Sequence, residues 1–327
     1  MVNWQARASA HLETWRPYTS CYVGLVGLAG AGLAAAHPGG LRLTAAWAIP
    51  TMGWLAGLYG GDYFDRELDA ISKPQRPIPS GRLRPATALA VMIGLIAMAA
   101  ALTVLLNWRP LLVVAAATAV GLSYNGFFKA RGLAGNLVRG SLTAFAFVFG
   151  AVIAQGRVGG GTIVVAAVFA LQDTGSNLVG TLRDIDGDRD GGYLTFPVRH
   201  GVTATVAVIG GLVAAWSVLA AAAGGITGRG WPVIFVALLA VAVATSCAVT
   251  GRLHRFRDQL SRRFALHMHE VLCLERIVLA LAFVALGAGP VLALGAGVPA
   301  LALTRVSQQR LRARHEFAVP AVPVKSY

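Results

Sequence analysis

The chain has 327 residues, of which 56% are hydrophobic and only 13% are charged. A soluble domain carries roughly 25% charged residues, about twice this share. The composition therefore excludes an ordinary soluble enzyme, a disordered chain, a coiled coil and a disulfide-stapled secreted scaffold. It indicates a protein that crosses a membrane several times.

Apolar runs long enough to cross a bilayer recur along the whole chain. Nine of them fall at residues 17–36, 43–61, 86–106, 109–124, 136–155, 161–180, 202–224, 232–250 and 272–304. Runs this long and this rich in Ala, Leu and Val favour helices over the short alternating strands of a barrel. We therefore expect an all-α integral membrane protein with about nine transmembrane helices. Pro290 interrupts the last run, which we expect to be one kinked span or a span followed by a re-entrant piece.

The expected spans leave no room for a separate soluble domain. We divide the chain into a cytoplasmic N-terminal segment (1–16), a single transmembrane domain (17–304) and a polar, basic C-terminal tail (305–327). The first 16 residues are polar and lack the apolar run of a cleavable signal.

Positive charge alternates between the two ends of the expected bundle. Four connections carry 16 Lys and Arg residues in total, whereas the connections between them carry one each. The positive-inside rule places the basic connections and the N-terminus in the cytoplasm, in a multi-pass protein of the cell membrane. After nine spans the basic tail would lie outside, so either the tail is an exception or the last segment re-enters.

The net charge of +14 favours two kinds of partner. Anionic membrane lipid is one, and a small polyanion such as a diphosphate is the other. Nucleic acid is not expected, because the basic loops are short and carry no folded reader.

Nine of the 14 acidic residues lie in two clusters, at the cytoplasmic ends of the second and sixth expected spans. The first holds Asp62, Asp65, Glu67 and Asp69, and the second holds Asp173, Asp184, Asp186, Asp188 and Asp190. Helical spacing places Asp62, Asp65 and Asp69 on one face of a helix. It also places Asp184 and Asp188 on one face of a second helix, with Asn177 two turns earlier on the same face. Converging carboxylates repel one another unless cations lie between them. Such oxygen ligands suit Mg²⁺ that is also bound to substrate phosphates, where it stabilises a departing diphosphate.

Longer stretches around these clusters carry a family resemblance. Residues 61–69 (GDYFDRELD) continue into KPQRPIPSGR at 73–82, and residues 184–198 read DIDGDRDGGYLTFPV. Ser123, Tyr124, Lys129 and Asn136 lie between them, and Arg16-Pro17 precedes them. Together they resemble the UbiA superfamily of intramembrane prenyltransferases, whose first motif is N-D-x-x-D-x-x-x-D and whose second contains D-x-x-x-D. The resemblance implies a nine-helix bundle around a central cavity.

The resemblance also implies roles for individual residues. Asp65, Asp69, Asp184 and Asp188 correspond to the catalytic ligands of Mg²⁺ and diphosphate, Asp62 supports them, and Asn177 is a further possible metal ligand from the other helix. Arg76, Lys129 and Arg183 are candidates to hold the diphosphate. Tyr124 either orients the leaving group or anchors its helix at the membrane interface. Gly61 departs from the family, because it stands where the first motif has a metal-ligating Asn.

The resemblance implies Mg²⁺-dependent transfer of an isoprenyl group from an isoprenyl diphosphate to an acceptor. The acceptor is an unidentified small molecule, such as an aromatic or polar lipid precursor, and the reaction occurs within the membrane. One alternative is a membrane terpene cyclase, in which the prenyl chain captures its own cation. A second, which Gly61 motivates, is a non-catalytic prenyl-lipid carrier or pathway scaffold that binds without releasing diphosphate.

Overall fold

The computed structural model describes residues 4–155 and 158–317 of the chain. Within these ranges the chain forms helices and no strand, apart from a single parallel bridge between Arg131 and Leu194. The helices are α1 (Trp4–Trp15), α2 (Pro17–Ala34), α3 (Gly40–Phe64), α4 (Arg66–Ser72), α5 (Pro85–Leu106), α6 (Leu111–Ser123), η1 (Tyr124–Phe128), α7 (Gly132–Gln155), α8 (Gly160–Arg183), α9 (Ile185–Asp190), α10 (Phe196–Ile226), α11 (Val233–Arg255), η2 (Arg257–Gln259), α12 (Arg262–Ala288), α13 (Pro290–Ser307), η3 (Gln308–Arg312) and α14 (Ala313–Glu316).

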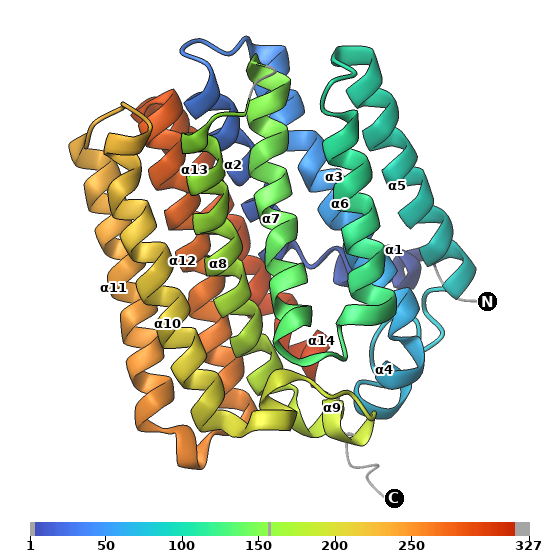
Figure 1. Ribbon diagram of the computed structural model, residues 1–327. Coiled ribbons are helices and arrows are strands. Elements are labelled where there is room, and N and C mark those ends of the chain that lie inside the picture. Colours follow the sequence, from blue (N-terminus) through green and yellow to red (C-terminus); the bar gives the residue numbers. More distant parts are fainter. Residues whose placement is uncertain (1–3, 156–157, 318–327) are drawn as a thin grey trace, which may run out of the picture.

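The long helices run side by side in one bundle (Figure 1). In the described part of the chain, eight helices are long and apolar enough to cross a membrane. The less apolar α2 and α3 coincide with the expected spans at 17–36 and 43–61, and α2 packs against α3, α7 and α12. The prediction of an all-α membrane bundle is confirmed.

The last expected span, 272–304, is two antiparallel helices and not one kinked span or a span with a re-entrant piece. Gly289 separates α12 from α13 with a φ of 91°, a conformation that glycine adopts without strain. Pro290 then begins α13, where a missing N–H costs nothing. Because α13 runs back along α12 and α2, the chain after it returns to the end of the bundle that holds α4 and α9 (Figure 1).

The segment expected to be a polar tail from residue 305 begins inside α13 and stays helical to Glu316. Its basic residues therefore lie at the same end of the bundle as the acidic clusters, which removes their conflict with the other basic connections. Residues 318–327 of this segment lie outside the described residues, as do residues 1–3 of the N-terminal segment.

Glycines allow the central helices to approach closely. A Cβ atom on Gly150 of α7 would lie 1.9 Å from the carbonyl oxygen of Gly27 on α2. A Cβ on Gly27 would in turn lie 1.9 Å from the carbonyl oxygen of Ala46 on α3. Small residues at such crossings are the usual basis of helix packing in membranes. They hold α2, α3 and α7 together around the cavity described next.

Candidate active site

The two acidic clusters have the same local structure. A long helix and a short helix meet at an aspartate in each: α3 and α4 at Asp65, and α8 and α9 at Asp184. The N–H of Asp69 donates to the carbonyl oxygen of Asp65 at 2.7 Å, and that of Asp188 donates to Asp184 at 2.8 Å. In both clusters, two aspartates four residues apart therefore lie one helical turn apart.

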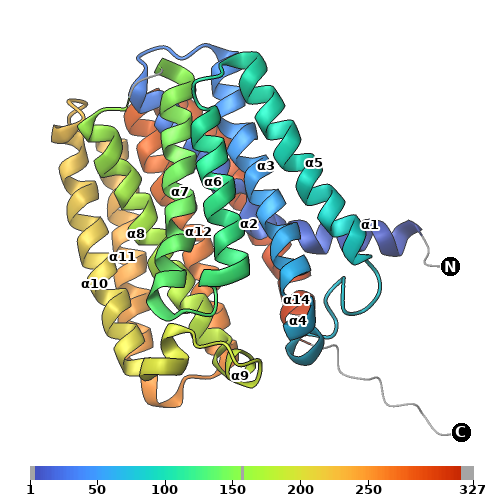
Figure 2. The ribbon, with the colours of Figure 1, turned by 45° about the vertical axis from the view of Figure 1, so that its right-hand side comes forward.

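The short helices α4 and α9 approach each other at glycines in and directly after α9 (Figure 2). A Cβ on Gly187 would lie 3.1 Å from the Cβ of Ser72, and one on Gly191 would lie 1.9 Å from Cδ1 of Leu68. Ser72 and Leu68 both belong to α4. The glycines of the second motif thus set the distance between the two pairs of aspartates.

All four of these aspartates line one cavity of about 570 Å³. Asp65 and Asp69 reach it from one side, and Asp184 and Asp188 from the other. The buried Asp62 lies beside them and forms an ion pair with Arg16. Its second carboxylate oxygen, Oδ2, is buried without a hydrogen-bond partner.

Cations from neighbouring segments pair with the aspartates of the first motif. The ammonium group of Lys129 binds the carboxylate of Asp65. Nη1 of Arg76 donates to both carboxylate oxygens of Asp69, at 2.8 Å each. Although burial lowers the pKa of Lys129, the charge of Asp65 raises it above its usual value, so the lysine is a firmly charged partner.

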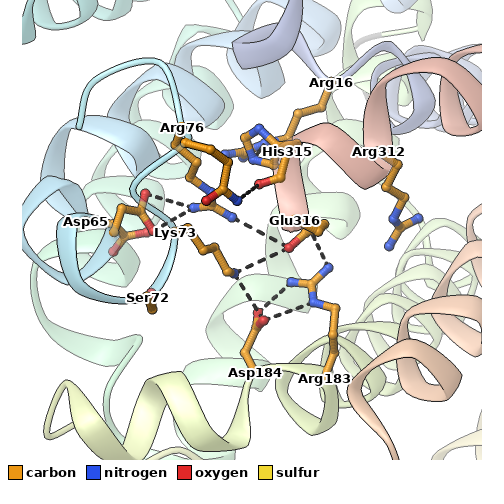
Figure 3. A network of polar contacts seen from close by, with 12 residues as sticks. Arg16, Asp65, Ser72, Lys73, Arg76, Arg183, Asp184, Arg312, His315 and Glu316 are labelled. Atoms are coloured by element: carbon orange, nitrogen blue, oxygen red, sulfur yellow. Dashed lines mark hydrogen bonds and ion pairs between the residues drawn. The ribbon is translucent and has the colours of Figure 1, made fainter. Parts of the chain in front are cut away.

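Asp184 of the second motif binds two cations (Figure 3). The guanidinium of Arg183 donates from Nε and Nη2, at 3.0 and 2.5 Å, and the Nζ of Lys73 lies 3.1 Å away. Burial acts to raise the pKa of Asp184, but Arg183 and Lys73 outweigh it and hold the pKa well below its usual range. Burial and the charge of Arg76 lower the pKa of Lys73.

Asp188 has no ion-pair partner among the described residues, and its surroundings suit a cation. Burial, together with the charge of Asp184, raises the pKa of Asp188 to about 6. A buried carboxylate beside a second one is stabilised when a divalent cation binds between them. No three His, Cys, Asp or Glu side chains in residues 4–155 and 158–317 lie close enough to hold a metal by themselves. This donor set fits Mg²⁺, which takes one or two carboxylates and completes its shell with water and phosphate oxygens.

A π-helical turn, η1, shapes the wall that α6 and α7 provide. The N–H of Lys129 donates to the carbonyl oxygen of Tyr124 at 2.9 Å, a bond that spans five residues. Such turns often occur at functional sites. The turn places Tyr124, Asn125 and Lys129 on the cavity surface.

The remaining sequence candidates also lie at the cavity. Asn177 lines it, and its amide oxygen accepts a hydrogen bond from Asn136 at 2.7 Å. Gly61 lines it too, and a Cβ built on Gly61 would lie 3.9 Å from Oδ1 of Asn125. A carboxamide from another helix is therefore already present beside the position where the family motif has Asn.

Away from the aspartates the cavity is apolar. Its wall there includes Leu58, Met92, Val113, Leu142 and Phe149. A second, shallower apolar groove of about 400 Å³ lies on α5 and α6 and shares Ile96, Val114, Thr118 and Leu122 with the cavity. The cavity thus combines a charged end with an apolar end that reaches toward the outer side of α5 and α6.

Sequence reasoning gave no role to several residues that complete the charged end. Lys73 belongs to the stretch 73–82 that continues the first motif, and Arg16 belongs to the Arg16-Pro17 pair. Neither pattern shows which carboxylate the cation contacts. Tyr193 and Arg139 also line the cavity, and only their positions near motif residues could have suggested this. Glu316 contacts the cluster from 133 residues beyond Arg183, and no sequence pattern marks it.

The UbiA prenyltransferase family matches residues 22–272 of the chain. A digeranylgeranylglyceryl phosphate synthase of Natronomonas pharaonis is 36% identical over 161 residues, which are 48% of this chain and 57% of that relative. The corresponding enzyme of Halobacterium salinarum is 36% identical over 200 residues, 60% of this chain and 71% of the relative. The chain thus matches little more than half the length of the first of these relatives.

Solved structures have the same fold. One of a digeranylgeranylglyceryl phosphate synthase has a TM-score of 0.65 and 21% identity, and the match covers 86% of this chain and 99% of that one. A UbiA homologue from Archaeoglobus fulgidus, bound to GPP and Mg²⁺, has a TM-score of 0.68 and 15% identity, with 90% and 99% covered. With this fold, two aspartate motifs at one cavity and a family match over most of its length, the chain belongs to the UbiA prenyltransferase family.

Proposed function

We propose that the protein transfers an isoprenyl group from an isoprenyl diphosphate to an acceptor within the membrane, with Mg²⁺ as cofactor. The observation that carries this proposal is the meeting of two aspartate pairs at the charged end of a cavity whose other end is apolar. The relatives named digeranylgeranylglyceryl phosphate synthase support it.

The reaction needs few protein groups beyond those at the charged end. The allylic C–O bond breaks and the diphosphate leaves with the electron pair, while Arg76, Lys129 and Arg183 donate to its oxygens. Mg²⁺ held by Asp65, Asp69, Asp184 and Asp188 supplies Lewis-acid stabilisation of the charge on the leaving group. A lone pair of the acceptor oxygen then forms the new bond to the allylic carbon, and the acceptor hydroxyl passes its proton to the released diphosphate. Tyr124, on the cavity wall, faces this charged end and is suited to stabilise the cation.

The apolar end of the cavity is suited to the prenyl chain. Its aliphatic and aromatic side chains offer no hydrogen bonds, so they favour a hydrocarbon over a polar group. The residues shared between the cavity and the groove on α5 and α6 give a long chain a route toward lipid. A tail longer than the cavity can therefore extend between these helices.

The acceptor we propose is a glycerol phosphate lipid with one free hydroxyl. The support is the printed name of the relatives, whose product carries two geranylgeranyl groups on glyceryl phosphate. We also place the charged end of the cavity on the cytoplasmic side, because the basic connections of the sequence lie at that end.

The test is product analysis with the purified full-length protein. It is incubated with geranyl, farnesyl or geranylgeranyl diphosphate, with Mg²⁺ and with geranylgeranylglyceryl phosphate or an aromatic acid as acceptor. Mass spectrometry should find the doubly prenylated glycerol phosphate. A cyclic terpene formed without acceptor would show that the protein is a cyclase and not a transferase. Binding of the prenyl diphosphate without release of diphosphate would indicate a carrier.

A further inference from the structure

The C-terminal arm, which we define as residues 308–317, lies outside residues 22–272 that the family matches. It comprises η3, α14 and Phe317, and α14 lies at the end of the bundle that holds α4 and α9 (Figure 1). Four of its polar side chains are buried: Gln308, Arg312, His315 and Glu316 are 3%, 1%, 1% and 4% exposed. The arm thus adds charged groups to a site whose other residues, apart from Arg16, come from the family part of the chain.

Glu316 lies among three cations of the site (Figure 3). Its Oε1 accepts a hydrogen bond from Nη1 of Arg183 at 2.9 Å. Its Oε2 lies 3.5 Å from the Nζ of Lys73 and 4.0 Å from Nη2 of Arg76, and accepts no hydrogen bond. The carboxylate of Glu316 therefore lies between three cations, but it accepts a hydrogen bond from Arg183 alone among these three.

The charges of this group balance only when Glu316 is counted. Lys73, Arg76 and Arg183 carry three positive charges, and their partners Asp69 and Asp184 carry two negative charges. Glu316 is the third negative charge. Without the arm, one of these three cations would lack an ion-pair partner and could pair with an anionic ligand.

The arm has attachments that do not depend on the charge of Glu316. Nε2 of Gln75 donates to the carbonyl oxygen of His315 at 3.1 Å, and Nη2 of Arg262 donates to that of Glu316 at 2.9 Å. The guanidinium of Arg262 also lies 5.1 Å from the centre of the Phe317 ring. Removing the charge at position 316 therefore keeps these backbone attachments and loosens the arm only through the lost ion pairs with Arg183 and Lys73.

We propose that Lys73, Arg76 and Arg183 form a binding site for a phosphate group of a substrate, and that Glu316 is its built-in competitor. This inference rests on the proposed function, which supplies a ligand with phosphate groups. A phosphate has enough oxygens to accept hydrogen bonds from all three cations, which the Glu316 carboxylate does not do. Arg183 keeps Asp184 through Nε and Nη2 while its Nη1 exchanges Glu316 for phosphate.

The test compares wild type with Glu316→Gln in the purified full-length protein. Calorimetry measures the binding of inorganic pyrophosphate with Mg²⁺ and, separately, of glycerol 1-phosphate. We expect Glu316→Gln to bind one of these probes about tenfold more tightly, because a like charge close to the ligand is gone. Glu67→Gln is the matched control and should bind like wild type, since Glu67 is 87% exposed and, among the described residues, its ion-pair partner is Arg66 alone. Tighter pyrophosphate binding assigns the site to the prenyl donor, and tighter glycerol 1-phosphate binding assigns it to the acceptor.

Hydrogen exchange of the wild-type arm gives a second measurement that needs no variant. Exchange at residues 308–317 should increase when the probe displaces Glu316. The inference would be overturned if Glu316→Gln bound both probes as weakly as wild type or more weakly. It would also be overturned if hydrogen exchange of the arm stayed unchanged with the probe bound. Either result would leave the proposed function intact. Failure of wild type to bind pyrophosphate with Mg²⁺ would contradict the proposed function, and failure of Glu316→Gln to bind either probe would overturn the inference as well.

Discussion

The ion pairs at the charged end of the cavity connect residues that are far apart in the chain. Asp65 and Lys129 are separated by 64 positions, and Lys73 and Asp184 by 111. A buried carboxylate is costly unless it is paired, so these cations stabilise the folded site before any ligand binds. When a diphosphate binds with Mg²⁺, the same cations can turn to phosphate oxygens while the carboxylates take the metal. The site can thus exchange partners without leaving a buried charge unpaired.

Gly61 leads to a prediction at the scale of one residue. Its Cβ position has no atom closer than Oδ1 of Asn125 at 3.9 Å, so Gly61→Asn should fold normally. The added carboxamide oxygen should lower the Mg²⁺ concentration for half-maximal binding several-fold, because Mg²⁺ prefers oxygen ligands. Magnesium-dependent thermal stabilisation measures this. Gly57→Asn, one turn earlier on the same cavity wall and equally unhindered, should leave the Mg²⁺ requirement unchanged.

At the scale of elements, the close approach of α4 and α9 positions the two motifs. Gly191→Ala would place a methyl group 1.9 Å from Cδ1 of Leu68, so the Leu68 side chain must turn away or one of the short helices must shift. We expect Mg²⁺-dependent activity to fall by at least about tenfold, since small displacements of catalytic groups are costly, with little change in the unfolding temperature.

A second substitution separates this steric effect from other consequences of Gly191→Ala. Leu68→Ala removes the atoms that the new methyl group meets, so the double variant Leu68→Ala/Gly191→Ala should recover most of the activity. Enzyme assays of the two single variants and the double variant form a thermodynamic cycle. Additive losses would show that α4 and α9 do not set the spacing of the aspartates.

Hydropathy predicted the helices well but placed several boundaries too early. The expected span 43–61 continues to Phe64, and 161–180 continues to Arg183, because polar residues at the cavity keep the helical hydrogen bonds. These extensions carry the chain up to Asp65 and Asp184. The break at Gly289 was also missed, since two consecutive apolar helices with a tight turn look like one long apolar run.

At the scale of the whole molecule, the return of α13 places the C-terminal arm and the aspartate motifs at one end of the bundle. This arrangement predicts which positions are accessible from the same side of the membrane. Single cysteines replacing Asp186 and Arg314, both exposed, should react with an impermeant maleimide in vesicles of the same orientation. A cysteine replacing Gly39, in the connection between α2 and α3, should react only in the opposite orientation. The native cysteines Cys21, Cys247 and Cys273 are replaced beforehand.

Labelling of Arg314→Cys and Gly39→Cys in vesicles of the same orientation would contradict this topology. The chain would then cross the membrane one time fewer.

The topology was only partly predictable from the sequence. The basic connections were predicted to lie at the same end of the bundle as the motifs, as they do, and the motifs identified four of the aspartates that line the cavity. The ion-pair partners and Glu316 could not be predicted, because they depend on how α13 packs against α2 and α12.

The central claim is that the two motifs act together to ionise a prenyl diphosphate. The most direct measurement is release of pyrophosphate from geranylgeranyl diphosphate by the purified protein with a pooled set of acceptors, with and without Mg²⁺. Release should require Mg²⁺ and should fall by about a hundredfold or more in both Asp65→Asn and Asp184→Asn. It should persist in Glu67→Gln, whose side chain is 87% exposed. Undiminished release in either Asp65→Asn or Asp184→Asn, or equal release without Mg²⁺, would contradict the account.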